Sequence, residues 1–189
     1  MAVSRITPPV SRPVSLNDVK LHLRIETNDD DGYIDNLIDA AVVHLELVSG
    51  LKLITQTWRQ YLDVRPPSGM IRLGVGPVRE IIAARYFDAN GVAQTINPLN
   101  MLVDAISTPA RLLISGGLPV GQSLNGIEID IVTGYGDSAT EVPDSLRRAL
   151  LLLVAHNYEF RGAVPVGQMP ASEPHGFRTL IAPFRKINL

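Results

Sequence analysis

The residues of this chain with the clearest potential for chemistry lie near its end, in the sequence LVAHNYEFRG at residues 153–162. His156 and Glu159 are three positions apart, and on a helix this spacing places both side chains on the same side. An imidazole and a carboxylate placed in this way could bind a metal ion or transfer a proton. A hydrolase that uses His156 and Glu159, with a metal ion or with other carboxylates, is therefore one hypothesis for this chain.

The rest of the sequence gives this hypothesis little support. A zinc or di-iron site needs three or four ligands, usually with a second pair on another helix, and the chain has four histidines without an HExxH or HxH motif. Cysteine is absent, which excludes disulfides and thiolate metal or redox sites. We therefore expect no catalytic, metal-binding or cofactor-binding residues. Instead, we expect His156, Tyr158 and Glu159 to form hydrogen bonds with neighbouring elements or subunits.

The acidic and glycine-rich stretches fit structural roles better than chemical ones. Asp29, Asp30 and Asp31 lack the alternating spacing and the final glutamate of a calcium loop, so helix capping explains them better. The stretches GVGPV and GGLPVG have no following Lys-Ser/Thr, and no G-x-S-x-G elbow is present. A ligand-binding β module, for example for carbohydrate, stays open as a further hypothesis. Its candidate aromatic residues are Trp58, Tyr61, Tyr86 and Phe87.

Composition indicates an ordinary globular protein. The 189 residues are enough for one sizeable core or for two small lobes that share one, and 46% of them are hydrophobic. The formal net charge of −2 gives no general attraction to nucleic acid or to an anionic membrane. The most apolar stretch, ALLLLVA, is much shorter than the roughly 20 residues of a membrane span. The N-terminus lacks the apolar region of a signal peptide.

Three helices are predicted to position the candidate residues. The first begins at Leu16, with Ser15 as its N-cap and Asp18 as an acidic capping-box partner. The second follows the acidic turn and ends at Gly50, and its apolar residues recur at helical spacing. The third runs from about Val142 to Arg161. This helix is apolar on every side, which predicts that it is central to the fold or covered by another subunit.

The sequence pattern between the second and third helices predicts several short strands. Residues 51–135 contain seven apolar or alternating runs separated by turn sequences such as Asn90-Gly91. In IEIDIV, apolar and acidic residues alternate, so one face of this strand should be buried and the other solvated. Strands at this spacing predict a small antiparallel barrel or sandwich. The last 28 residues contain four prolines and look extended, but their apolar and basic end, FRTLIAPFRKINL, suggests a docking peptide.

Six segments, in order, link the chain to a known family: PVSLNDVKLHLRIETNDDDGYIDNLIDAAVVHLE, LITQTW, IRLGVGPVREI, YFDANG, IVTGYGDSATEVPDSLRRALLLLVAHNYEFRG and LIAPFR. Together they resemble the head–tail connector (adaptor) proteins of tailed bacteriophages and gene transfer agents. The resemblance implies a non-enzymatic, structural role at the head–tail junction of the virion, with assembly in the host cytoplasm. It also implies a dodecameric ring under the portal protein, with a tail-side stopper or tail terminator protein below. DNA would pass through the channel without sequence-specific binding, and no membrane would be involved.

The resemblance also implies an α+β fold with four parts. Residues 1–50 would form an N-terminal arm and helices, 51–135 an inserted antiparallel β barrel or sandwich, 136–162 a long helix that completes the helical core, and 163–189 an extended docking tail. The expected portal-binding residues are Phe177, Leu180, Ile181, Phe184 and Arg185. The expected subunit contacts are His156, Tyr158, Glu159 and Arg161. The expected helical core contains Leu37, Ala41, Leu45, Leu150, Leu153 and Val154.

Overall fold

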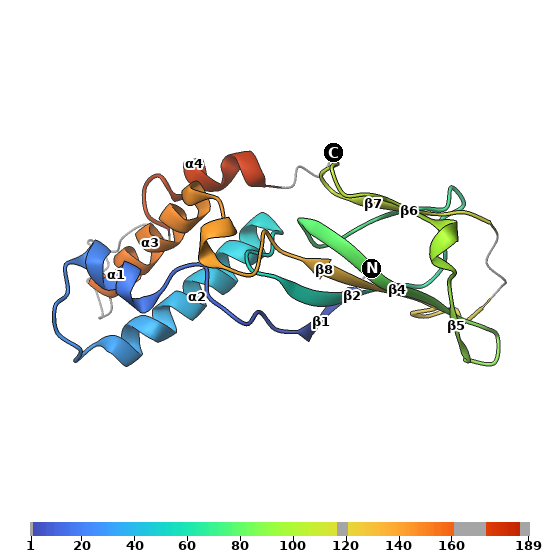
Figure 1. Ribbon diagram of the computed structural model, residues 1–189, viewed down its shortest axis with the longest axis horizontal. Helices are drawn as coiled ribbons and strands as arrows, with labels where there is room; N and C mark the ends of the chain where they lie inside the picture. The colour runs from blue at the N-terminus through green and yellow to red at the C-terminus, as the bar shows by residue number, and fades with distance from the viewer. Residues whose placement is uncertain (1, 117–120, 161–172, 186–189) are drawn as a thin grey trace, which may run out of the picture.

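A computed structural model describes residues 2–116, 121–160 and 173–185 of the chain. The molecule is elongated, with the helices gathered at one end and most of the strands at the other (Figure 1). Two separate clusters of buried apolar side chains correspond to these ends, one among the helices and one between two antiparallel sheets. The fold is therefore of the mixed helix-and-sheet class that the sequence predicts.

The helical end is built from α1 (Leu16–Leu23), α2 (Asp31–Ser49), α3 (Asp144–Glu159) and α4 (Phe177–Ile181). Helix α1 begins with the predicted capping box, in which the Asp18 amide donates to Ser15 Oγ and the Ser15 amide donates to the Asp18 carboxylate. Gly50 ends α2 with a positive φ of 72°, a conformation that glycine adopts without a steric penalty. Both helix boundaries follow from local sequence signals.

Helix α3 lies at the centre of this end. It packs against α1, α2 and α4, which explains why its apolar residues are distributed around the whole helix. The start of the β region also contributes to this core, through Leu51, Leu53 and Ile54. The buried side chains of the helical core are Val14, Val19, Ile34, Ile38, Ala41, Leu45, Leu51, Leu53, Ile54, Val142, Leu146, Ala149, Leu150, Leu153, Val154, Phe177 and Ile181, with Leu37 partly buried against them.

The other end contains two antiparallel sheets. The five-stranded sheet has the order β1-β2-β8-β4-β5 and is formed by β1 (Ala2–Thr7), β2 (Gln56–Leu62), β8 (Ile127–Thr133), β4 (Val78–Phe87) and β5 (Ala93–Thr95). The three-stranded sheet has the order β3-β7-β6 and is formed by β3 (Met70–Arg72), β7 (Arg111–Ile114) and β6 (Met101–Asp104). The two sheets share a core that includes Ile129 of β8 and Leu112 of β7. In β8, the alternation seen in IEIDIV buries the isoleucines, as predicted, but the opposite face is not solvated, because Asp130 is buried and Glu128 is half-buried in ion pairs with Arg59 and Arg85.

The strands do not close into a barrel. Closure would require the edge strands of the two sheets to pair, whereas in residues 2–116 and 121–160 the strands β1, β5, β3 and β6 each pair on one side only. The barrel that we considered is therefore not formed by the described strands. Strand β1 was not predicted at all, and it extends the five-stranded sheet by pairing with β2.

The end of the chain differs from the extended tail that the sequence suggested. Residues 177–181 form the short helix α4, followed by a 3₁₀ turn at Ala182–Phe184. Phe177 and Ile181 are four residues apart, so a helical turn directs both side chains into the helical core. This apolar packing outweighs the extended preference that the nearby prolines suggested. The remainder of the expected tail, residues 163–172 and 186–189, lies outside the described residues.

Candidate interaction surfaces

The His156–Glu159 pair lies on the last two turns of α3. His156 is half-buried, with its ring centroid 5.1 Å from that of Phe160, and Glu159 is exposed. Within the described ranges, no group of three His, Asp or Glu side chains could hold a metal ion. The other predicted subunit contact on this helix, Tyr158, donates a hydrogen bond to the Asp30 carboxylate at the start of α2. Arg161 lies outside the described residues.

Tyr158 therefore has a role within the subunit. Its ring lies 6.2 Å from that of Tyr33 on α2, measured between centroids. Together with the hydrogen bond to Asp30, this contact joins the end of α3 to the beginning of α2. The structure thus brings Tyr158 together with α2, while Glu159 points into the solvent at the end of its helix.

The five predicted portal-binding residues divide into two groups. Phe177 and Ile181 are buried in the helical core, with exposed fractions of 0% and 2%. Leu180 and Phe184 are partly buried against the same core, and Arg185 is exposed. Only the second group is accessible to a partner while α4 is seated in this position.

Polar contacts also hold this segment on α2. His44 lies 3.3 Å from the Glu173 carboxylate, and its ring centroid is 5.8 Å from that of Phe177. Arg178 donates to the other Glu173 oxygen at 2.6 Å. The hydrogen bond from Arg178 lowers the pKa of Glu173, burial opposes this effect, and His44 adds to the lowering. The C-terminal segment is therefore attached to α2 by the contacts of His44 with Glu173 and Phe177, while Arg178 pairs with Glu173 within the segment.

Glu46 is a structural residue that the sequence did not single out. It is only 9% exposed, and its carboxylate accepts hydrogen bonds from the Leu53 amide at 3.0 Å and from Gln56 Nε2 at 3.1 Å. Lys52 Nζ lies 3.1 Å from the other oxygen. These contacts join the end of α2 to the start of β2. A signal was present in the sequence, because Glu46 follows the half-buried Val42 by one helical turn, at the edge of the apolar face.

The acidic face of β8 carries a compact network of charges. Asp130 is 7% exposed and accepts two hydrogen bonds from Arg59 of β2, at 2.6 and 3.0 Å, and one from Arg85 of β4 at 3.0 Å. Glu128 lies 3.1 Å from Arg59 and 3.4 Å from Arg85. Burial acts to raise the pKa of Asp130, but the two arginines outweigh it, so its pKa is lower than usual. Two carboxylates paired with two guanidinium groups stabilise the sheet and offer no free base.

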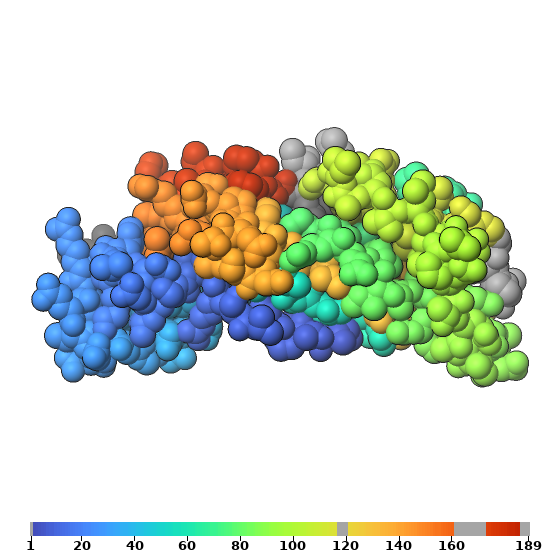
Figure 2. Space-filling model, viewed as in Figure 1, coloured from blue at the N-terminus to red at the C-terminus, as the bar shows by residue number. Residues whose placement is uncertain are grey.

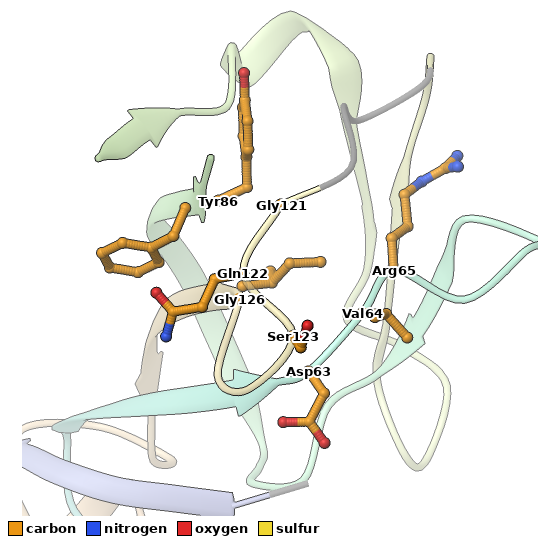
Figure 3. Close-up of a pocket in the computed structure, with 10 residues that line it drawn as sticks. Asp63, Val64, Arg65, Tyr86, Gly121, Gln122, Ser123 and Gly126 are labelled. Carbon is orange, nitrogen blue, oxygen red and sulfur yellow. The ribbon is translucent and has the colours of Figure 1, made fainter. Parts of the chain in front are cut away.

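A cavity of about 350 Å³ opens at the far end of the β region (Figure 3). Its polar side chains do not converge on a ligand, because Asp63, Arg65 and Tyr86 point away from one another. Asp63 accepts a hydrogen bond from the Asn125 amide, and Arg65 donates to the Ile114 carbonyl, so both side chains hold loops in place. This cavity gives the hypothesis of a ligand-binding module no support.

Comparisons with known proteins identify the kind of molecule. Residues 13–97 match the sequence model of the phage gp6-like head–tail connector proteins. A chain described as "Neck of native GTA particle computed with C12 symmetry" matches with a TM-score of 0.81 and 25% identity, over 100% of this chain and 97% of its own length. Part of the chain thus matches the head–tail connector family, and its whole length is similar to a chain of a gene transfer agent neck. These similarities support a structural role as a head–tail connector.

Two further solved structures are similar to this connector over its whole length. They are described as "Neck of empty GTA particle computed with C6 symmetry", at 25% identity, and "Virion of native gene transfer agent (GTA) particle", at 26% identity. Both matches have a TM-score of 0.81 and cover 100% of this chain and 97% of the other. A comparison with curated proteins gives no match. In the described part of the connector, no helix is both long and apolar enough to cross a bilayer.

Proposed function

We propose that twelve copies of this connector form a ring under the portal at the capsid vertex. The ring would join the capsid to the tail-side stopper or tail terminator protein and surround the channel through which DNA passes. The observation that carries this proposal is the full-length structural similarity to a chain from a neck with C12 symmetry. The formal net charge of −2 is consistent with a channel that DNA crosses without being bound tightly. The site of action would be the virion, after assembly in the host cytoplasm.

The accessible part of the C-terminal segment would contact the portal. Phe177 and Ile181 would anchor α4 in the helical core, while Leu180, Phe184 and Arg185 would face the portal protein. This division follows from the full burial of the first two side chains, the partial burial of Leu180 and Phe184, and the exposure of Arg185. His156, Tyr158, Glu159 and Arg161 would lie at or near contacts between neighbouring subunits, with Tyr158 also keeping its contact to α2.

Portal binding by a charge-reversed variant tests this assignment. Phe184→Ser combined with Arg185→Glu should weaken binding to purified portal by at least about tenfold, because both an apolar contact and a charge are lost. Arg148→Glu is a matched control, since Arg148 is exposed on α3 and its reversal changes the charge by the same amount. Wild-type affinity in the double variant would contradict the assignment of the C-terminal segment.

The proposed role requires no enzymatic activity. The competing hypothesis is a hydrolase that uses His156 and Glu159, and it predicts stoichiometric metal in the purified protein that is lost in His156→Ala. We expect metal analysis to give the same low content for the wild type and for this variant.

A further inference from the structure

An apolar surface covers the outer face of the three-stranded sheet. Met70 of β3, Leu113 of β7 and Leu102 of β6 are partners in the strand register, so their side chains lie in one row on the same face. Met70 is 43% exposed and Leu102 is 67% exposed. Next to this row, Arg72 and Arg111 face outward together with Asp104. We refer to these six residues as the sheet face.

A second apolar surface runs along the outer side of α2. Ala40, Val43 and Leu47 lie three and four residues apart, so they form one line on the helix. Val43 is 63% exposed and Leu47 is 80% exposed. Asp35 and Asp39 flank this line. We refer to these five residues as the helix stripe.

The two surfaces are complementary in charge as well as in hydrophobicity. On the sheet face, Arg72 and Arg111 contribute two positive charges and Asp104 contributes one negative charge, so the net charge is +1. On the helix stripe, Asp35 and Asp39 are paired with the single Arg12, which leaves one net negative charge by the same arithmetic. Apolar surfaces with opposite net charge favour contact with each other over contact with a second copy of themselves.

The two surfaces belong to different parts of the molecule. Helix α2 belongs to the helical end and runs toward the middle of the molecule, whereas β6 and β7 belong to the β region (Figures 1 and 2). A contact between two different surfaces of identical subunits is head-to-tail, and such contacts generate a closed ring when the rotation closes. This geometry matches the ring of the proposed function, on which the following inference rests.

We propose that the sheet face of each connector subunit packs against the helix stripe of the next subunit in the ring. The occupant of each surface is thus a second copy of this chain. Burial of Leu47, Val43, Leu102 and Met70 removes from water four of the larger apolar side chains that the monomer exposes.

The turn after β6 supplies an additional contact. Ile106 at this turn is 97% exposed, yet the turn is firmly held, because Asp104 accepts hydrogen bonds from the Ile106 and Ser107 amides and is paired with Arg111. A cavity of about 260 Å³ lies beside Val43, between α2 and the N-terminal segment at Arg5 and Pro9. The cavity is large enough for an isoleucine side chain, and its lining combines Val43, Leu53 and Ile54 with charged side chains such as Arg12 and Asp39. Ile106 of the neighbouring copy enters this cavity.

Cysteine cross-linking tests the interface directly, because the natural chain has no cysteine. The variant carries Leu47→Cys and Leu102→Cys in one chain, is assembled with portal, and is treated with a short bismaleimide. We expect a ladder of covalent multimers in a denaturing gel, since each chain would be joined to two neighbours. Chains with only one of the two cysteines should give no cross-linked species.

A matched control pairs Leu102→Cys with Leu21→Cys. Leu21 is 70% exposed on α1 but lies outside the helix stripe, so this pair should give no ladder. A ladder from the control pair, or dimers from a single-cysteine variant, would overturn the proposal. The absence of a ladder in rings that are visible by electron microscopy would also overturn it, while leaving the ring itself intact. If no ring forms at all, the proposed function fails as well.

Discussion

Glu46 is a single side chain that joins the helical end of the molecule to its β region. Its carboxylate accepts hydrogen bonds from the Leu53 amide and from Gln56, at the point where the chain passes from α2 into β2. Buried donors without an acceptor are costly, so the contribution of Glu46 comes mainly from satisfying groups that would otherwise be unpaired. These contacts fix the orientation of the start of β2 relative to α2.

Replacing Glu46 with alanine should lower the free energy of unfolding by about 2–4 kcal/mol, because the Leu53 amide and Gln56 lose their acceptor. Urea denaturation followed by circular dichroism measures this change. Glu26→Ala serves as the control, since Glu26 is exposed, and its effect should stay within about 0.5 kcal/mol. Equal stability of the two variants would show that Glu46 does not hold the start of β2 against α2.

The charge network on β8 predicts a stability effect that depends on pH. The pKa of Asp130 is lower in the folded chain than in an unfolded one, so its ionisation stabilises the fold above the ordinary aspartate value of about 3.9. This contribution is lost as the pH falls through the lowered folded pKa. Arg59→Gln removes the main partner of Asp130, so the variant should lack most of the contribution.

The difference in unfolding free energy between wild type and Arg59→Gln should therefore be largest near neutral pH and should shrink below about pH 4. Urea denaturation at several pH values tests this expectation. Arg72→Gln on the exposed part of β3 should show no such trend. A difference for Arg59→Gln that stays constant with pH would contradict the assigned role of the network.

Sequence reasoning at the residue scale succeeded where the signal is local. The capping box of Ser15 and Asp18 and the stop at Gly50 depend on neighbours within a few positions, and both are confirmed. The pairing of Arg59 with Asp130 could not be predicted, because these residues are 71 positions apart and meet only through strand register. Glu46 was missed because its partners become neighbours only after the chain turns back on itself.

At the scale of elements, α4 is the clearest difference between expectation and structure. Prolines and a basic end suggested an extended peptide, but Phe177 and Ile181 fill a gap in the helical core beside α3. Local propensity is a weak guide for a five-residue helix, whose stability comes almost entirely from packing. The long helices α2 and α3 were predicted well because their apolar periodicity extends over several turns.

Phe177→Ala tests whether α4 is seated as described. Removal of a fully buried phenylalanine side chain should lower the free energy of unfolding by about 3–5 kcal/mol. Phe160→Ala is the matched control, because Phe160 is 46% exposed and its loss should cost much less. If both variants have the same midpoint urea concentration of unfolding as the wild type, α4 does not contribute to the core in solution.

The sheets illustrate the limit of sequence reasoning about topology. The alternation in β8 correctly predicted the buried isoleucines, but the expected solvated face is wrong, because Asp130 is buried between Arg59 and Arg85 of the neighbouring strands. The alternation carried no information about which strands would be its neighbours. The number of sheets and the absence of a closed barrel among the described strands depend on pairings between distant segments. The pairing of β1 with β2 across more than fifty residues is an example.

At the scale of the whole molecule, elongation and two unlike exposed surfaces fit a subunit that is completed by its neighbours. The helix stripe and the sheet face are different surfaces on different elements, as a head-to-tail contact requires. Under the proposed function, the C-terminal segment would face the portal, and the connector would act through assembly. The proposed interface would cover exposed apolar residues such as Leu47 and Leu102.

The measurement that tests this account most directly is an electron microscopy reconstruction of the connector bound to its purified portal. The account predicts a closed ring of twelve copies, as in the similar neck of C12 symmetry, coaxial with the portal and surrounding an open channel. In this ring, α2 of each copy should face β6 and β7 of the next. Copies that bind singly, or a ring that does not share the axis of the portal, would contradict the central claim.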